Sequence, residues 1–344
     1  MDYTKQLFQN KASKKVTKRL LYPDICKFIA IFLVTWSHCA QCVSGQTWPN
    51  FLFGKSIDIA FNMPLFMIIS GWFINLKILR ETSATTYINS KFKRLIIPAV
   101  VWFFINIIVS YDNLPMYLSG KGLIWFIKAM LNYYWYLTAL FCCLTIIFIT
   151  TKIFKDNKAT IVFSIVLVTL CPFSEFANIN FMFPFIWAGY ILRKLLYKYT
   201  TRFYFTSFVI ISFILIGFWD SSSTVYLYPF IPMHLSFPMI VTHIYRFFIG
   251  LIISFVIISI VKRYENTKIS YLAPLGQYTL IIYVASITFL HFLSILLSKD
   301  YLLNQPVLLE LISLLICILI CIASIYIGKF CRKSTISKLL FLGE

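Results

Sequence analysis

The sequence predicts an all-α fold: a polytopic membrane helical bundle of about ten transmembrane helices, with both termini cytoplasmic. Three observations predict it. Of the 344 residues, 60% are hydrophobic and only 12% are charged, whereas soluble proteins are about 25% charged. Long apolar segments recur along the whole chain and are separated by polar ones. The basic residues, finally, fall mainly in alternate polar segments.

Ten apolar segments are long enough, or nearly long enough, to cross a bilayer as helices. A membrane-spanning helix needs about 20 apolar residues, with about 17 as the usual minimum. Several segments fall short of that length, so their bounds are expected to shift by a few residues. The predicted spans are 25–43, 57–76, 95–112, 132–151, 159–173, 179–192, 204–219, 244–261, 274–297 and 307–328.

The formal net charge of +19 would suit a nucleic-acid-binding protein, but the positions of the charges argue against that class. With the N-terminus in the cytoplasm, 25 of the 31 Lys and Arg residues fall in predicted inside segments. Four fall in outside loops and two fall within spans. This is the positive-inside distribution for an even number of spans. It predicts a multi-pass protein of the cytoplasmic (inner) cell membrane, with the lipid bilayer and no nucleic acid as partner.

Three regions follow from this pattern. A basic N-terminal segment, 1–23, precedes the membrane domain, 24–328, and a basic tail, 329–344, follows it. No small-residue cleavage site follows the first apolar segment, which predicts an uncleaved signal-anchor helix. The loop 220–243 lacks Lys and Arg and contains three prolines. It is predicted to lie outside and to fold back as a lid.

The first span carries three ionisable residues, Asp24, Lys27 and His38. Such residues inside a membrane helix are costly and usually face a partner or a water-filled cavity. Lys27 and His38 share a helix face and lie about 16 Å apart along the axis, and Asp24 is near enough to pair with Lys27. Two plainer interpretations stay open. Asp24 and Lys27 could end the apolar span, and His38 could be a hydrogen-bonded core histidine.

The second span and the start of the third contain further features. Pro64 predicts a kink, and the pair Ser70 and Gly71 predicts a close approach to another helix. Lys91 and Arg94 are three residues apart and face the same way at the cytoplasmic entrance of the third span. Ordinary anchoring by positive residues is the interpretation that this pair alone favours. The alternative is a clamp for the phosphates of an anionic cytosolic ligand.

The later spans offer weaker signals. Arg246 lies at the top of the eighth span, where a charge without support would be costly. Most of the nine cysteines fall in apolar spans and are expected to behave as small hydrophobic residues. Cys39 and Cys42 follow His38 with CxxC spacing. No second Cys or His pair is in reach by sequence, so no metal site is predicted.

Six short segments, which follow one another along the chain, resemble the motifs of one protein family. The first reads DICKFIAIFLVTWSH (24–38) and the second NMPLFMIISGWF (62–73). The others are KFKRLIIPAVVW (91–102), YWYLTALF (134–141), FPFIWAGYILRK (183–194) and PLGQYTLIIY (274–283). Each alone is weak, but the ordered series resembles the bacterial integral-membrane acyltransferases called acyltransferase family three. The resemblance covers about 25–285, most of the chain.

The sequence departs from the family pattern at several positions. The family's Arg in the first segment is Lys27 here, which keeps the charge but loses the bidentate geometry of a guanidinium. The family's RxxR-type pair is Lys91 and Arg94. Asn62 and Ser286 stand where the family often has histidines, so these two residues are not taken as site residues.

The resemblance implies a membrane O-acyltransferase that moves an acyl group, usually acetyl, from cytosolic acyl-CoA to a hydroxyl. The acceptor would be a cell-surface glycan or its lipid-linked precursor. His38 would act as general base, by direct transfer in preference to an acyl-His intermediate. Lys27, Lys91 and Arg94 would bind acyl-CoA, with Asp24 and Arg246 as supporting charges. Acyl-CoA is a substrate here, and no bound cofactor is expected.

Two functions from other classes remain alternatives. One is a transporter of glycans or lipid-linked sugars, against which the missing inverted repeat argues mildly. The other is a non-catalytic membrane subunit of a polysaccharide assembly. The sequence leaves the acyl group, the acceptor hydroxyl and the oligomeric state open.

Overall fold

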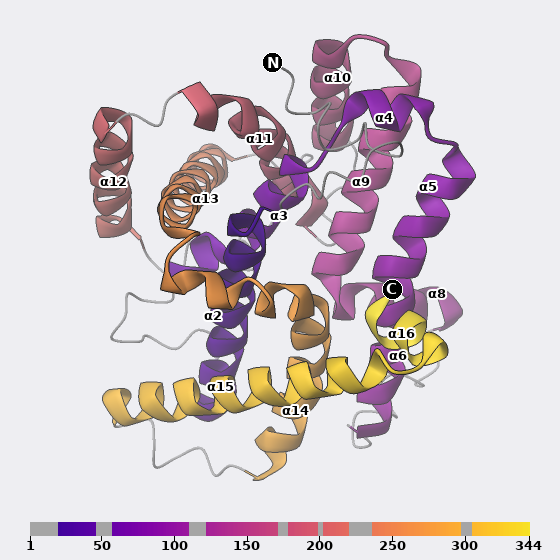
Figure 1. The fold of residues 1–344 in the computed structure, drawn as a ribbon, viewed down its shortest axis with the longest axis vertical. Helices are drawn as coiled ribbons and strands as arrows, with labels where there is room; N and C mark the ends of the chain where they lie inside the picture. Colours follow the sequence, from indigo (N-terminus) through magenta and orange to yellow (C-terminus); the bar gives the residue numbers. More distant parts are fainter. Residues whose placement is uncertain are drawn as a thin grey trace.

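The computed structural model describes most of the chain as helices (Figure 1). The described residues are 20–45, 57–109, 122–170, 178–198, 202–219, 236–296 and 305–344. Within them every regular element is a helix and no strand occurs, which confirms the all-α class for that part. Most of the predicted N-terminal segment 1–23 and of the predicted lid 220–243 lies outside the described residues.

Six helical stretches are long and apolar enough to cross a membrane. They are Tyr22–Ser44 (α2), Ala84–Val109, Trp135–Ile153 (α9), Phe237–Tyr264 (α13), Lys268–Ser294 and Val307–Cys331. Asn157–Leu170 (α10) and Phe205–Gly217, within α12 (Arg202–Gly217), are shorter apolar helices. The chain is therefore a helical membrane protein, while ten spans and cytoplasmic termini stay predictions.

Shorter elements complete the described architecture. Near the start they are η1 (Ile57–Ala60), α3 (Asn62–Trp72), α4 (Leu76–Glu81), α5 (Ala84–Lys91), the π-helical η2 (Phe92–Ile96) and α6 (Ile97–Val109). Later ones are α8 (Gly122–Tyr133), α11 (Ile179–Lys198), η7 (Lys268–Leu272), η8 (Leu275–Tyr278), α14 (Thr279–Leu296), α15 (Pro306–Cys331) and α16 (Thr335–Leu342).

The first predicted span forms the centre of the fold. Helix α2 packs against α3, α13, α14 and α15, and Figure 1 shows it running through the middle of the molecule. Its side chains Ile25, Cys26 and Ala30 are fully buried. An apolar helix that is buried on several sides belongs to the interior of a bundle, so the polar side chains of α2 are held in a rigid frame.

Helices α3 and α11 cross with their backbones in direct contact. A Cβ atom added at Gly71 would lie 1.8 Å from the carbonyl oxygen of Ile186, and one at Gly189 would lie 1.9 Å from that of Ile68. Only glycine fits such a crossing. This confirms the close helix approach predicted at Gly71.

The prediction of a kink at Pro64 is wrong. Pro64 lies in the first turn of α3, which begins at Asn62. Backbone N–H groups in the first turn have no partner within the helix, so a proline costs little there. The predicted span 57–76 is instead η1 followed by the short helix α3.

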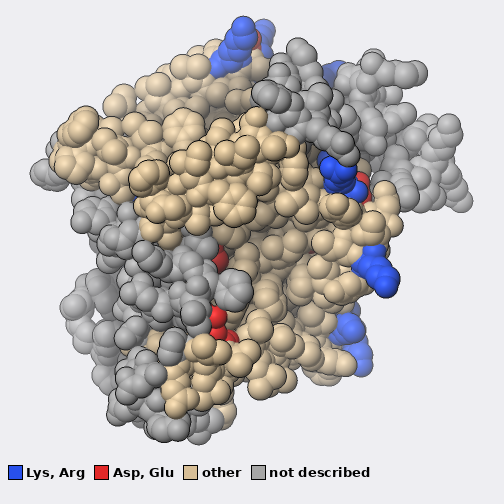
Figure 2. All heavy atoms as spheres, turned by 90° about the vertical axis from the view of Figure 1, so that its left-hand side faces the viewer, with Lys and Arg blue, Asp and Glu red and all other residues tan. Residues whose placement is uncertain are grey.

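The surface fits a protein that sits in lipid. Figure 2 shows a broad face free of Lys and Arg among the residues it describes, with Lys and Arg at its margins and few acidic atoms. Helix α15 exposes large apolar residues such as Leu315, Leu319 and Ile322. An extended exposed apolar surface marks a site that another apolar phase covers, and for these long helices that phase is the bilayer.

The segment predicted as a tail, 329–344, packs against the membrane domain. Helix α15 continues to Cys331, and α16 then folds back onto α6. The rings of Phe341 and Trp102 meet edge to face with centroids 6.0 Å apart. Gly343 ends α16 with a positive φ of 64°, and its α-carbon faces the backbone of Arg94 so closely that an added Cβ would clash.

Candidate functional site

A cavity of about 870 Å³ lies beside the first turns of α2. Its walls come from α2, α3, α4, α5, η2, α9, η8, α14 and the region of α16. The charged residues that line it are Asp24, Lys27, Lys91, Arg94, Arg332 and Glu344. Four of these six were predicted as site residues, so the fold brings together in one cavity side chains from distant parts of the sequence.

Asp24 and Lys27 pair as the spacing predicts. Lys27 Nζ lies 3.4 Å from Asp24 Oδ1, and the ammonium also lies 5.5 Å from the centre of the Phe73 ring. Asp24 itself is buried. A Cβ at Gly276 would lie 2.0 Å from the carbonyl oxygen of Asp24. The backbone of η8 therefore rests directly on the first turn of α2, which fixes the position of the pair.

Lys91 and Arg94 line the same cavity from α5 and η2, and together they are called its cationic mouth below. They flank the start of η2, and Lys91 Nζ lies 5.4 Å from the centre of the Tyr87 ring. Among the described residues no carboxylate comes within ion-pair distance of either cation. Short π-helical turns often occur at functional sites. The two cations are thus positioned to meet an anion that enters the cavity.

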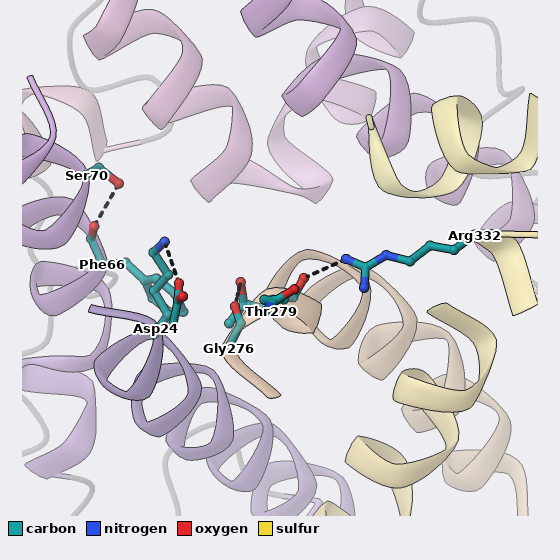
Figure 3. Close-up of polar contacts among 8 residues, drawn as sticks. Asp24, Phe66, Ser70, Gly276, Thr279 and Arg332 are labelled. Carbon is teal, nitrogen blue, oxygen red and sulfur yellow. Dashed lines mark hydrogen bonds and ion pairs between the residues drawn. The ribbon is translucent and has the colours of Figure 1, made fainter. Parts of the chain in front are cut away.

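Arg332 and Glu344 were not predicted as site residues. Arg332 Nη2 lies 2.8 Å from Glu344 Oε1, and the guanidinium lies 4.5 Å from the centre of the Tyr278 ring. The hydrogen bond to Glu344 raises the pKa of Arg332. Figure 3 shows Arg332 reaching toward the Gly276–Thr279 segment, which lies between it and Asp24. The segment TISKLLFL (335–342) has enough apolar residues to predict docking, and that was the available signal.

The inner part of the cavity is apolar and aromatic. Met63, Phe66, Tyr136 and Tyr283 line it, and the Phe66 and Tyr136 rings lie 5.5 Å apart. The Tyr136 and Tyr283 rings meet edge to face at 6.0 Å. Ser70 donates its hydroxyl hydrogen to the carbonyl of Phe66 at 2.9 Å (Figure 3). The cavity therefore suits a ligand with an anionic end and a long, mostly uncharged arm.

His38 lies farther along α2, outside the set of cavity-lining residues. The last α2 residue that lines the cavity is Ile31, and His38 follows it by seven residues, or about 10 Å along the axis. His38 Nδ1 lies 2.9 Å from Gln41 Oε1. Because the amide oxygen can only accept, Nδ1 carries the hydrogen and Nε2 is left as the basic nitrogen.

The residue that precedes His38 in the sequence contacts an acidic side chain from η1. The hydroxyl of Ser37 donates to the carboxylate of Asp58 on η1. The sequence alone does not predict this contact, because nothing in one sequence tells which ends of two helices meet. The contact ties η1 to the outer part of α2 next to His38.

Arg246 is buried elsewhere in the fold. It belongs to α13, is only 2% exposed, and its guanidinium lies 5.5 Å from the centre of the Phe181 ring. It is not among the residues that line the cavity. Its predicted supporting role therefore stays a prediction. His291 Nε2 lies 2.7 Å from the hydroxyl of Tyr133, which gives this histidine a hydrogen-bond partner.

Comparison with known proteins gives the class that this helical membrane fold belongs to. Residues 20–326 match the acyltransferase domain of acyltransferase family three. The chain therefore belongs to this family.

Among curated proteins, the chain is similar to "Nodulation protein NolL" of Sinorhizobium fredii, with 29% identity over 184 residues. The matched part covers 50% of this chain and 48% of that relative. The chain thus spans about half the length of the curated relative that it matches. No solved structure matches the chain.

Proposed function

We propose that this acyltransferase moves an acyl group, most often acetyl, from cytosolic acyl-CoA to a hydroxyl of a cell-surface glycan or its lipid-linked precursor. The observation that carries the proposal is the cavity, which joins a cationic mouth to an aromatic interior beside the family's first span. Its volume lies within the range of about 300–1,000 Å³ typical of ligand and cofactor pockets.

The cationic mouth supports acyl-CoA as the donor. Coenzyme A carries phosphate groups, and charge-assisted hydrogen bonds from Lys and Arg are the usual way to hold them. Lys91 and Arg94 have no carboxylate partner among the described residues, so they are the principal candidates. Lys27 is partly neutralised by Asp24 and would contribute less.

The aromatic interior supports the orientation of the donor. With the phosphates at Lys91 and Arg94, the uncharged arm of the donor would run past Phe66 and Tyr136 toward the middle of α2. The thioester at the end of that arm would then approach His38 from the side of Ile31. The glycan hydroxyl would approach from the opposite side, where Ser37 and Asp58 meet.

His38 is proposed as the general base of the transfer. Its Nδ1–H is directed to Gln41, so Nε2 can accept the proton of the acceptor hydroxyl. The acceptor oxygen then bonds to the thioester carbonyl carbon, the carbon–sulfur bond breaks, and the thiolate leaves and takes up a proton. Direct transfer of this kind needs no covalent acyl-His intermediate, which remains the second route.

The location of the protein is part of the proposal. The basic residues of the sequence favour a multi-pass protein of the inner cell membrane with its cationic mouth on the cytoplasmic side. That side is where acyl-CoA is available.

The test combines a gene deletion with an assay of the purified protein. Deletion should remove acyl esters from the surface glycan, and wild-type protein, but not the His38→Gln variant, should restore them. Purified protein should release free coenzyme A from acetyl-CoA only when acceptor glycan is added. A deletion strain that loses the glycan itself, with no thioester cleavage by purified protein, would contradict the proposal and favour a transporter.

A further inference from the structure

The cavity contains a cation that already has an anion bound to it. Arg332 lines the cavity beside the end of α15, and its guanidinium donates to the Glu344 carboxylate at 2.8 Å. Glu344 also lines the cavity. Its second carboxylate oxygen lies 3.7 Å from Lys338 Nζ. A carboxylate thus occupies one side of a cavity whose other charges are mostly positive.

The fold presents Glu344 at this place through several contacts. Phe341 packs against Trp102, Gly343 takes a positive φ against the backbone of Arg94, and the Glu344 amide donates to the Lys338 carbonyl at 3.2 Å. Because α16 packs against α6, the carboxylate of Glu344 at its end lines the cavity. These contacts together set its position beside Arg332.

Arg332 is held in place independently of Glu344. Its guanidinium lies 4.5 Å from the Tyr278 ring centre, and Nη2 also lies 3.5 Å from the carbonyl oxygen of Gln277. Contacts with an aromatic face and with a carbonyl orient the planar guanidinium. It can therefore change its anionic partner without moving its side chain far.

The ion pair between Arg332 and Glu344 is partly exposed. The Arg332 side chain is 27% exposed and the Glu344 side chain is 36% exposed. Ion pairs open to water contribute little net stability. A ligand phosphate offers more negative charge and more acceptor oxygens than one carboxylate, so it should displace Glu344 at low cost.

We infer that Arg332 is a further donor-binding cation and that Glu344 is its exchangeable counter-ion, which holds the guanidinium until a phosphate of the donor replaces it. The inference rests on the proposed role of the cavity as the acyl-CoA site. It adds a residue from outside the region that resembles the family, and it makes α16 part of the donor site.

The test measures binding of free coenzyme A, which has no acyl group to transfer, to the detergent-purified full chain by calorimetry. Arg332→Gln should weaken binding about tenfold or more, because a charge-assisted contact is lost. Glu344→Gln should tighten it about two- to fivefold, because the competing anion is gone. A variant that folds poorly does not bind more tightly, so the gain with Glu344→Gln separates exchange from damage.

A double-mutant cycle tests the coupling. In the Arg332→Gln background, Glu344→Gln should change the dissociation constant by less than about twofold, because the cation for which it competes is absent. Lys333→Gln is the matched control. It removes the same charge one residue away, from a side chain that does not line the cavity, and should leave binding within about twofold of wild type.

The outcomes separate this inference from the proposed function. If wild-type protein does not bind coenzyme A, the donor site and the inference are both wrong. If it binds, and binding depends on Lys91 and Arg94 but not on Arg332, only the inference is overturned. If Glu344→Gln changes the dissociation constant equally in both backgrounds, the carboxylate acts by long-range repulsion of the ligand. The proposed exchange at Arg332 would then be wrong.

Discussion

The two ends of helix α2 are built differently. At the cavity end, Asp24 and Lys27 line one cavity with cations from α5, from η2 and from the end of α15. At the other end, His38 is oriented by Gln41 one turn along the same helix. One end collects charges from distant parts of the chain, and the other holds a single imidazole by local contacts.

This difference matches two kinds of chemical work. Several point charges that hold a polyanion can share the task, so each contributes a fraction of the binding free energy. A proton in transfer needs one atom of suitable basicity in one place. Losses at the cavity end should therefore be graded and appear in donor binding. A loss at the His38 end should be nearly complete and appear in turnover.

The largest effect is expected at His38. His38→Gln should lower turnover about 10²- to 10⁴-fold, the usual contribution of a positioned general base. Binding of coenzyme A should stay within about twofold of wild type, because His38 does not line the cavity. Glutamine keeps hydrogen-bonding capacity and serves as its own structural control. Turnover within about tenfold of wild type, measured on monodisperse protein, would remove His38 from the mechanism.

The next effect is expected at the cationic mouth. Replacing both Lys91 and Arg94 by Gln should raise the apparent KM for acyl-CoA about ten- to hundredfold, because charge-assisted contacts of about 1.5–3 kcal/mol are lost. The kcat at saturating donor should change little. The matched control is Lys93→Gln, which removes an exposed charge that does not line the cavity. An unchanged KM in the double variant would return both residues to membrane anchoring.

A smaller effect is expected at Gln41. Its amide oxygen is the acceptor that sets the tautomer of His38. Gln41→Leu removes one net hydrogen bond of about 0.5–1.5 kcal/mol and should lower kcat about two- to tenfold with little change in KM. Gln41→Glu keeps an acceptor at that place and should retain more activity. Equal losses in both variants would indicate that Gln41 acts through packing.

The sequence predicted the parts of this comparison that depend on local spacing. The first span was expected at 25–43 and the helix runs from Tyr22 to Ser44. Asp24 and Lys27 pair because a helix places residues three apart on one face. Lys91 and Arg94 enter the same cavity for the same reason. For both pairs, a spacing of three residues in a helix was sufficient for the prediction.

The parts that depend on tertiary folding could not be predicted. Arg332 reaches the cavity only because α15 and η8 meet, and Glu344 reaches it only because α16 folds back onto α6. The contact between Ser37 and Asp58 depends on how η1 meets α2. Pro64 was misread because a proline inside an apolar run does not show whether the helix kinks or begins there.

The smallest effect is expected from salt, and it tests both ends of α2 in one protein. Arg94 is exposed, and Arg332 is only partly covered. Salt screens exposed charges, with a Debye length of about 10 Å at 0.1 M and about 3 Å at 1 M. Raising the ionic strength should therefore raise the KM for acyl-CoA about two- to fivefold and leave kcat nearly constant. In the proposed mechanism, transfer of a proton between His38 and a hydroxyl involves no exposed ion pair that salt could weaken. The variant with Gln at positions 91 and 94 should show a flatter dependence of KM on salt, because two of the screened charges are gone. If kcat falls in parallel with donor binding, salt acts on the whole bundle. The assignment of donor binding to one end of α2 and of turnover to the other end would then be wrong.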